Sequence, residues 1–170
     1  SGNSALGYTD YYIPNCNADA FRTAEKTLRE RSAKFGADVC VKQWLHGQDL
    51  VFDQCFPISK DFPEEASATA PSWFRADRAY QIAAAHFYAG RYLEAAKKFD
   101  AIAVDGTSPW QELGAYLSAR SLLRYATTSY GRNPDADAML TKAEKRLTEA
   151  KQNVSGAAHI SEINRLLQRI

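Results

Sequence analysis

Few residues in this chain have the types and spacing that catalysis or metal binding requires. The three histidines, His46, His86 and His159, are far apart in the sequence, and none belongs to an HExxH pattern. The chain has no GxSxG motif and no glycine-rich loop of the kind that cradles a phosphate. The adjacent carboxylates Glu64 and Glu65 lie in a proline-rich segment, where a catalytic geometry is hard to hold. We therefore expect no enzymatic activity, no metal site and no cofactor, with a hydrolase that uses this acidic pair as the alternative.

The three cysteines, Cys16, Cys40 and Cys55, carry more information. Apolar residues recur with helical spacing on both sides of Gly36, which predicts two helices joined by a short link and therefore antiparallel. In such a hairpin Cys16 and Cys55 lie at the same end, within reach of a disulfide, whereas Cys40 lies at the other end. A Cys16–Cys55 bond would indicate an exported or periplasmic protein. Three buried thiols in a cytoplasmic protein are the alternative, and the spacing only slightly favours the bond.

The charge and hydropathy of the chain argue against two classes of partner. Lysine and arginine number 21 and aspartate and glutamate number 20, so the formal net charge is +1. This balance gives no long-range attraction to nucleic acid or to an anionic membrane surface. Because no run of about 18 apolar residues is present, we also expect no helix inserted in a membrane.

Helical periodicity predicts an all-α protein of about seven helices in one domain, since no strand pattern extends far enough to compete with it. Pro57, Pro63 and Pro71 interrupt the periodicity, and we expect the segment around them to cross the surface between two helical hairpins. Ser72 is expected to cap the helix that follows. The predicted parts are an irregular lead-in over 1–16, a helical hairpin over 17–55, a proline-rich acidic loop over 56–71, and helical repeats over 72–170.

Two amphipathic helices joined at Gly90 are predicted next, and their pattern resembles a tetratricopeptide repeat. Ile82 and Ala83 match the large and small residues of that family's first helix. Ala95 and Phe99 match the small and aromatic residues of its second helix. The resemblance implies antiparallel helix hairpins stacked as a short right-handed α-solenoid, and hence a binding scaffold.

Two positions depart from the family pattern. Ala79 stands where a bulky aromatic residue is usual, and His86 stands where tyrosine is usual. We expect His86 to be a hydrogen-bonded core histidine. The chain starts at Ser1 without Met and ends in an uncapped helical stripe, so we expect a fragment of a larger bacterial protein.

In the tetratricopeptide family, the first helix of each pair lines a concave groove that binds peptides. Carried over position by position, the resemblance implies a groove formed by Asp77, Tyr80, Gln81, Tyr88, Tyr116, Arg120 and Arg124. Arg120 and Arg124 lie one turn apart and could grip an acidic peptide through bidentate hydrogen bonds. The alternative is that both arginines pair with nearby acids or cover apolar surface with their stems.

The function implied by the resemblance is a non-catalytic protein- or peptide-binding scaffold whose partner is acidic. The alternative function belongs to another class. It is a structural superhelix that positions the catalytic domain of an exported cell-wall enzyme, and a Cys16–Cys55 bond would favour it.

Overall fold

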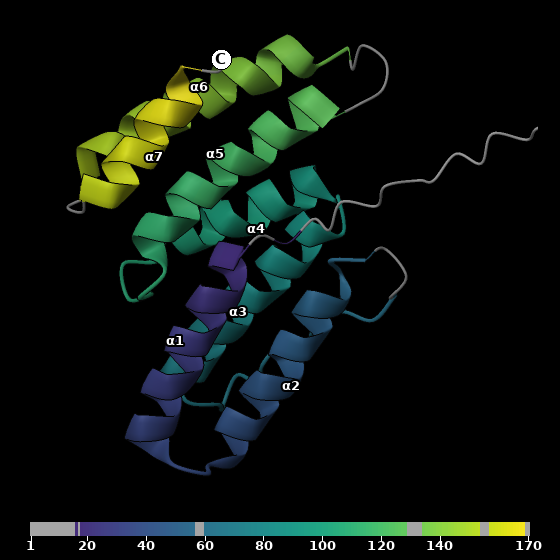
Figure 1. Cartoon of the computed structure of the whole chain (residues 1–170), viewed down its shortest axis with the longest axis vertical. Coiled ribbons are helices and arrows are strands. Elements are labelled where there is room, and N and C mark those ends of the chain that lie inside the picture. Colours follow the sequence, from purple (N-terminus) through teal and green to yellow (C-terminus); the bar gives the residue numbers. More distant parts are fainter. Residues whose placement is uncertain (1–15, 17, 57–59, 129–133, 154–156, 169–170) are drawn as a thin grey trace, which may run out of the picture.

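The computed structural model describes residues 16, 18–56, 60–128, 134–153 and 157–168. Nearly all of the lead-in predicted over 1–16 lies outside these residues. Within them the chain forms seven helices and no strand, as the periodicity predicts (Figure 1). The helices are α1 (Ala18–Phe35), α2 (Val39–Asp53), α3 (Ser72–Tyr88), α4 (Tyr92–Val104), α5 (Gln111–Thr128), α6 (Ala136–Asn153) and α7 (Ala157–Leu167).

Helices α1 and α2 form the predicted antiparallel hairpin. Gly36 ends α1 with a positive φ of 64°, a conformation that glycine adopts without steric cost. Asp38 caps α2, because its carboxylate accepts the backbone N–H of Cys40 at 2.7 Å.

At the other end of the hairpin, the structure joins Cys16 to Cys55 by a disulfide, with the two Cα atoms 5.2 Å apart. The bonded residues are 39 positions apart. Closing a loop of that size stabilises the folded chain by about 4 kcal/mol in the chain-entropy account. Cys40 is a buried free thiol.

Helix α2 runs parallel to α3, which the sequence did not predict. The guanidinium of Arg78 donates to the Gln43 carbonyl at 2.7 Å, and the amide of Gln81 donates to the Trp44 carbonyl at 2.9 Å. Positions therefore increase along both helices in the same direction. Stacked antiparallel hairpins would place these two helices in opposite directions, so the predicted order is wrong at this step.

The connection between α2 and α3 explains this direction. Its described part runs back along α3: the Phe62 ring lies 4.9 Å from the His86 ring near the end of that helix. Further on, the Ala68 carbonyl accepts from Arg75 at 2.9 Å near the start of the helix. The loop is thus a crossover, as predicted, but it returns the chain to the end at which α2 began.

Helices α3 and α4 form the hairpin that the repeat pattern predicts. Gly90 ends the turn with a φ of 73°, and Ala83 and Ala95 are fully buried where the two helices meet. Phe99 is also buried, at 1% exposure. Ser72 does not cap α3, because Pro71 holds the N-cap position and no side chain accepts a bond there.

Helices α4, α5, α6 and α7 continue as a series of neighbours packed along the chain (Figure 1). Asp100 of α4 links three of them, since it accepts from Ser118 of α5 at 2.5 Å and pairs with Arg146 of α6. Leu147 of α6 and Ile163 of α7 are both fully buried in one cluster, so α7 covers the apolar stripe of α6.

The contact between α4 and α5 is close enough to test by adding one methyl group. A Cβ at Gly114 would lie 3.0 Å from both the Phe99 carbonyl oxygen and the Ile102 side chain. Gly114→Ala gains about 1 kcal/mol of helix propensity, but overpacking against backbone costs about 1–3 kcal/mol. We expect a net loss of stability in urea unfolding, with Gly106→Ala, which meets no atom within 4 Å, as the neutral control. A Gly114→Ala protein more stable than the parent would contradict this packing.

Candidate functional site

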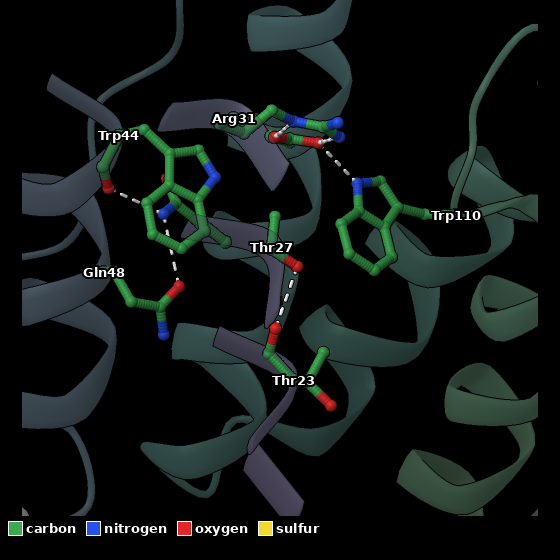
Figure 2. A network of polar contacts seen from close by, with 8 residues as sticks. Thr23, Thr27, Arg31, Trp44, Gln48 and Trp110 are labelled. Carbon is green, nitrogen blue, oxygen red and sulfur yellow. Dashed lines mark hydrogen bonds and ion pairs between the residues drawn. The ribbon is translucent and has the colours of Figure 1, made fainter. Parts of the chain in front are cut away.

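The seven residues of the predicted groove do not form an open surface. Asp77 is only 1% exposed, and its carboxylate accepts from Arg31 of α1 at 2.7 and 2.9 Å. It also accepts the indole N–H of Trp110 at 2.8 Å. Figure 2 shows Arg31 and Trp110 close to each other, with their hydrogen bonds to this carboxylate as dashed lines. Asp77 therefore serves the packing of α1 and is not available to a ligand.

Tyr80 and Gln81 are covered in the same way. The Tyr80 ring stacks on Trp110 at 4.4 Å, and burial raises the pKa of its hydroxyl. Gln81 donates to the Trp44 carbonyl at 2.9 Å and to the Gln48 side chain at 3.2 Å. Figure 2 shows Trp44 and Gln48 next to each other. The space left among α1, α2 and α3 here is only about 30 Å³. The prediction that these residues line a groove is wrong, because α1 lies on that face.

The α5 members of the predicted groove cover aromatic side chains. The Arg120 guanidinium lies 5.5 Å from the centre of the Phe87 ring, and that of Arg124 lies 5.6 Å from the Tyr92 ring. Arg124 also donates to the Tyr92 hydroxyl at 3.3 Å. Tyr116 is buried. This arrangement corresponds to the alternative in which the arginines cover apolar surface, each gaining a cation–π contact.

An open cavity lies elsewhere, and we call it the α3–α4 groove. Its volume is about 670 Å³, within the range of ligand-binding sites. Ala79, Ile82 and Ile102 give it an apolar wall. The full lining is Arg31, Glu65, Ala66, Ser72, Trp73, Arg75, Ala76, Arg78, Ala79, Ile82, Lys98, Ala101, Ile102, Asp105, Thr107, Ser108 and Pro109.

Positive charge prevails in the α3–α4 groove. Four cationic side chains line it; the charge of Arg31 is paired with Asp77, which leaves Arg75, Arg78 and Lys98 against the two carboxylates Glu65 and Asp105. Asp105 accepts both the N–H and the hydroxyl of Thr107, and these bonds lower the pKa of its carboxyl, so the negative charge is kept. The first turn of α3 also opens here without a side-chain cap, so its free backbone N–H groups add positive potential. The groove therefore suits an anionic group attached to an apolar body.

Sequence reasoning missed this groove because its cations look like ordinary solvated charges. Arg75 lies one turn before Ala79, and Lys98 lies one turn before Ile102, so each borders an apolar stripe. The sequence signal for the groove was a cation one turn before each apolar stripe. These two stripes lie near the start of α3 and near the end of α4, which come together in the hairpin. Only the hairpin geometry brings the two stripes together.

A second hollow of about 510 Å³ lies among α4, α5 and α6. Asp100, Glu112 and Glu149 line it together with Arg146. Asp100 is already bonded to Ser118 and Arg146. No group of three potential metal ligands occurs among the residues that the structure describes.

His86 differs from the hydrogen-bonded core histidine that we predicted. Its ring is half-buried against Phe62, and its Nδ1 is buried without a hydrogen-bond partner. Burial lowers the pKa of His86, and the nearby cations Lys98 and Arg91 lower it further, while Glu94 acts in the opposite direction.

Comparisons with known proteins give no family for this chain: no protein-family description, no curated protein and no solved structure shows significant similarity to it. Among the described residues, none of the helices combines the length and hydropathy needed to cross a membrane.

Removing the charge of Asp77 tests the contact between α1 and α3. Asp77→Asn leaves the Arg31 guanidinium without its counter-ion at a site where the arginine is 16% exposed. We expect a loss of about 3 kcal/mol, the low end for a broken buried pair, because Arg31 keeps some contact with water. Urea unfolding measures it, with the exposed Asp53→Asn as a control that should change stability by less than about 0.5 kcal/mol. Equal stabilities of the two variants would contradict this role.

The lowered pKa of His86 predicts a stability that depends on pH. As the pH falls, the unfolded chain takes up a proton at its ordinary pKa of about 6.5, before the folded chain does. The free energy of unfolding therefore falls from about pH 6.5 down to the lowered folded pKa. Unfolding curves at several pH values should show this loss in the parent and in the exposed control His46→Gln, and a smaller loss in His86→Gln. The same slope in all three proteins would exclude His86 as its source.

Proposed function

We propose that this chain is a non-catalytic protein- or peptide-binding module built from tetratricopeptide-like helix pairs, and that it binds an acidic segment of its partner in the α3–α4 groove. The observation that carries the proposal is the groove itself, in which an apolar wall meets a surplus of positive charge. The burial of Ala83, Ala95 and Phe99 at the helix contact supports the likeness to a repeat.

The chemistry of the groove favours a peptide that carries both carboxylates and apolar side chains. Ala79 and Ala101 offer exposed apolar surface in the groove, beside the buried Ile82 and Ile102, and such surface attracts a non-polar side chain. Arg75 and Lys98 offer donors to a carboxylate, and charge-assisted hydrogen bonds of this kind are the strong ones. Since the whole chain has a net charge of +1, attraction to such a peptide comes from the local arrangement and not from the overall field.

A second candidate function rests on a separate observation, the Cys16–Cys55 disulfide. Disulfides persist in oxidising compartments, so the bond favours an exported protein. In that setting the helices would form a structural superhelix that positions the catalytic domain of a cell-wall enzyme. This candidate needs no ligand in the α3–α4 groove, and a binding measurement therefore separates it from the first.

A labelled peptide of alternating glutamate and phenylalanine is the probe for the α3–α4 groove. We expect binding that weakens with salt and falls about tenfold in Lys98→Glu and in Arg75→Glu, because each reverses one charge beside the apolar wall. Fluorescence anisotropy measures the affinity. Lys97→Glu is the matched control, since Lys97 is the exposed neighbour of Lys98 and does not line the groove.

Two outcomes would contradict this assignment. Equal losses in Lys97→Glu and Lys98→Glu would show that the peptide senses net charge and not the groove. A loss of affinity in the Arg120→Glu, Arg124→Glu double variant, with none in Lys98→Glu, would show that the peptide binds at α5 instead.

A further inference from the structure

Helix α1 is attached to the rest of the molecule by few buried side chains. Of its described residues only Thr27 is buried, whereas α3 buries nine. Its other ion pairs, Arg22 with Asp19, Lys26 with Glu30 and Arg29 with Glu25, stay within the helix and lie in solvent. Most of the stability of a helix in a folded protein comes from the packing of its apolar face, so the order of α1 depends on the surface that it covers.

The surface under α1 has the form of a helix-binding groove. Small side chains of α1 at one-turn spacing, among them Ala20, Ala24 and Thr27, face Tyr80 and Tyr88 of α3. The space that remains is about 30 Å³, so the two faces fit closely. The aromatic side chains of α3 reach toward α1, and the small residues of α1 leave room for them.

The two ends of α1 fix its direction on that groove. Near its C-terminal end, Arg31 bonds to Asp77 early in α3, and Phe35 stacks on Trp73 at 4.5 Å. Nearer its N-terminal end, Ala20 lines the same small space as Tyr88, which lies at the end of α3. Helix α1 therefore lies antiparallel to α3, as an amphipathic ligand helix lies in a receptor groove.

The covalent links of α1 lead to α2 and not to α3. One is the short turn at Gly36, and the other is the Cys16–Cys55 disulfide at the far end. Helix α2 has its own bonds to α3 through Arg78 and Gln81. Opening the disulfide thus frees one end of α1 while α2 stays in place.

We propose that the face of α3 under α1 is a binding surface for a partner helix, that α1 is its built-in occupant, and that the Cys16–Cys55 disulfide keeps the surface closed. The partner helix carries the α1 pattern: small residues one turn apart, followed by an arginine that reaches Asp77. Opening requires a dithiol reductant, which supplies two electrons and two protons. The S–S bond breaks, both cysteines become thiols, and the reductant becomes a disulfide.

Hydrogen exchange on the full chain tests the release of α1. On reduction with a dithiol, we expect the α1 amides to lose protection by about tenfold or more while the α4 and α5 amides keep theirs. The Cys16→Ser, Cys55→Ser double variant should behave as the reduced chain does, and Cys40→Ala, which keeps the disulfide, as the oxidised chain does. Unchanged protection of α1 would overturn the proposal. A loss spread equally over α4 and α5 would also overturn it, because α1 would then belong to the core.

A synthetic peptide of residues 18–36 tests the binding surface itself. The chain's own α1 competes at high effective concentration, so the receptor is the Cys16→Ser, Cys55→Ser chain with Arg31→Glu, in which that competitor is weakened. We expect this receptor to bind the wild-type peptide about tenfold more tightly than the Arg31→Glu peptide, since only the former bonds to Asp77. A peptide with Arg29→Glu is the matched control, because Arg29 pairs only within α1.

The outcomes of the peptide experiment are decisive in both directions. Tight binding of the wild-type and Arg29→Glu peptides, with weak binding to the oxidised chain, supports the surface and its control by the disulfide. No difference between the Arg31→Glu and Arg29→Glu peptides would overturn the proposal. This experiment uses no acidic peptide and measures no binding in the α3–α4 groove, so failure here leaves the proposed function to its own test.

Discussion

A carboxylate at 1% exposure must find hydrogen-bond donors inside the protein, because burying an unpaired charge costs several kcal/mol. Asp77 finds them on two segments far apart in the sequence, Arg31 of α1 and Trp110 just before α5. Arg31 supplies the counter-charge through two hydrogen bonds, and Trp110 supplies a third donor to the same carboxylate. This requirement ties the first helix and the start of the fifth to the same end of α3, and it decides which face of α3 is closed.

The position of α1 follows from these hydrogen bonds together with the direction of α2. The returning connection, whose described part reaches from Phe62 to Ala68, makes α2 parallel to α3. Since α1 and α2 are antiparallel, α1 must then run antiparallel to α3, which lets Arg31 meet Asp77 at the start of α3. Had α2 and α3 been joined by a tight turn, α1 would run the other way and the arginine would lie at the wrong end. The length of one connection thus determines the direction in which α1 runs along α3, and with it whether Arg31 reaches Asp77.

Much of this fold could be predicted from local signals. Gly36 and Gly90 end helices with positive φ, and Ala83 and Ala95 are buried at a close helix contact, because backbone conformation and residue size act over a few positions. The candidate site could not be predicted in the same way. Asp77 looks like a surface charge in a repeat helix, and only its distant donors show otherwise. The repeat resemblance implied a groove on this face of α3, but it did not imply that α1 would lie there.

Arg31 belongs to both surfaces that this structure offers. It bonds to Asp77 through Nε and Nη2, and it also lines the α3–α4 groove as one of its four cations. Docked α1 therefore covers the face of α3 that carries Tyr80 and Tyr88, and it also supplies part of the positive charge of the α3–α4 groove. Displacing α1 opens the first surface and removes that charge from the second. If docked α1 raises the affinity of the α3–α4 groove for an acidic peptide, then by thermodynamic linkage the bound peptide lowers the affinity of α3 for a partner helix by the same factor. Under the two proposals, the surfaces are coupled through the Arg31 guanidinium, and occupation of one would oppose occupation of the other.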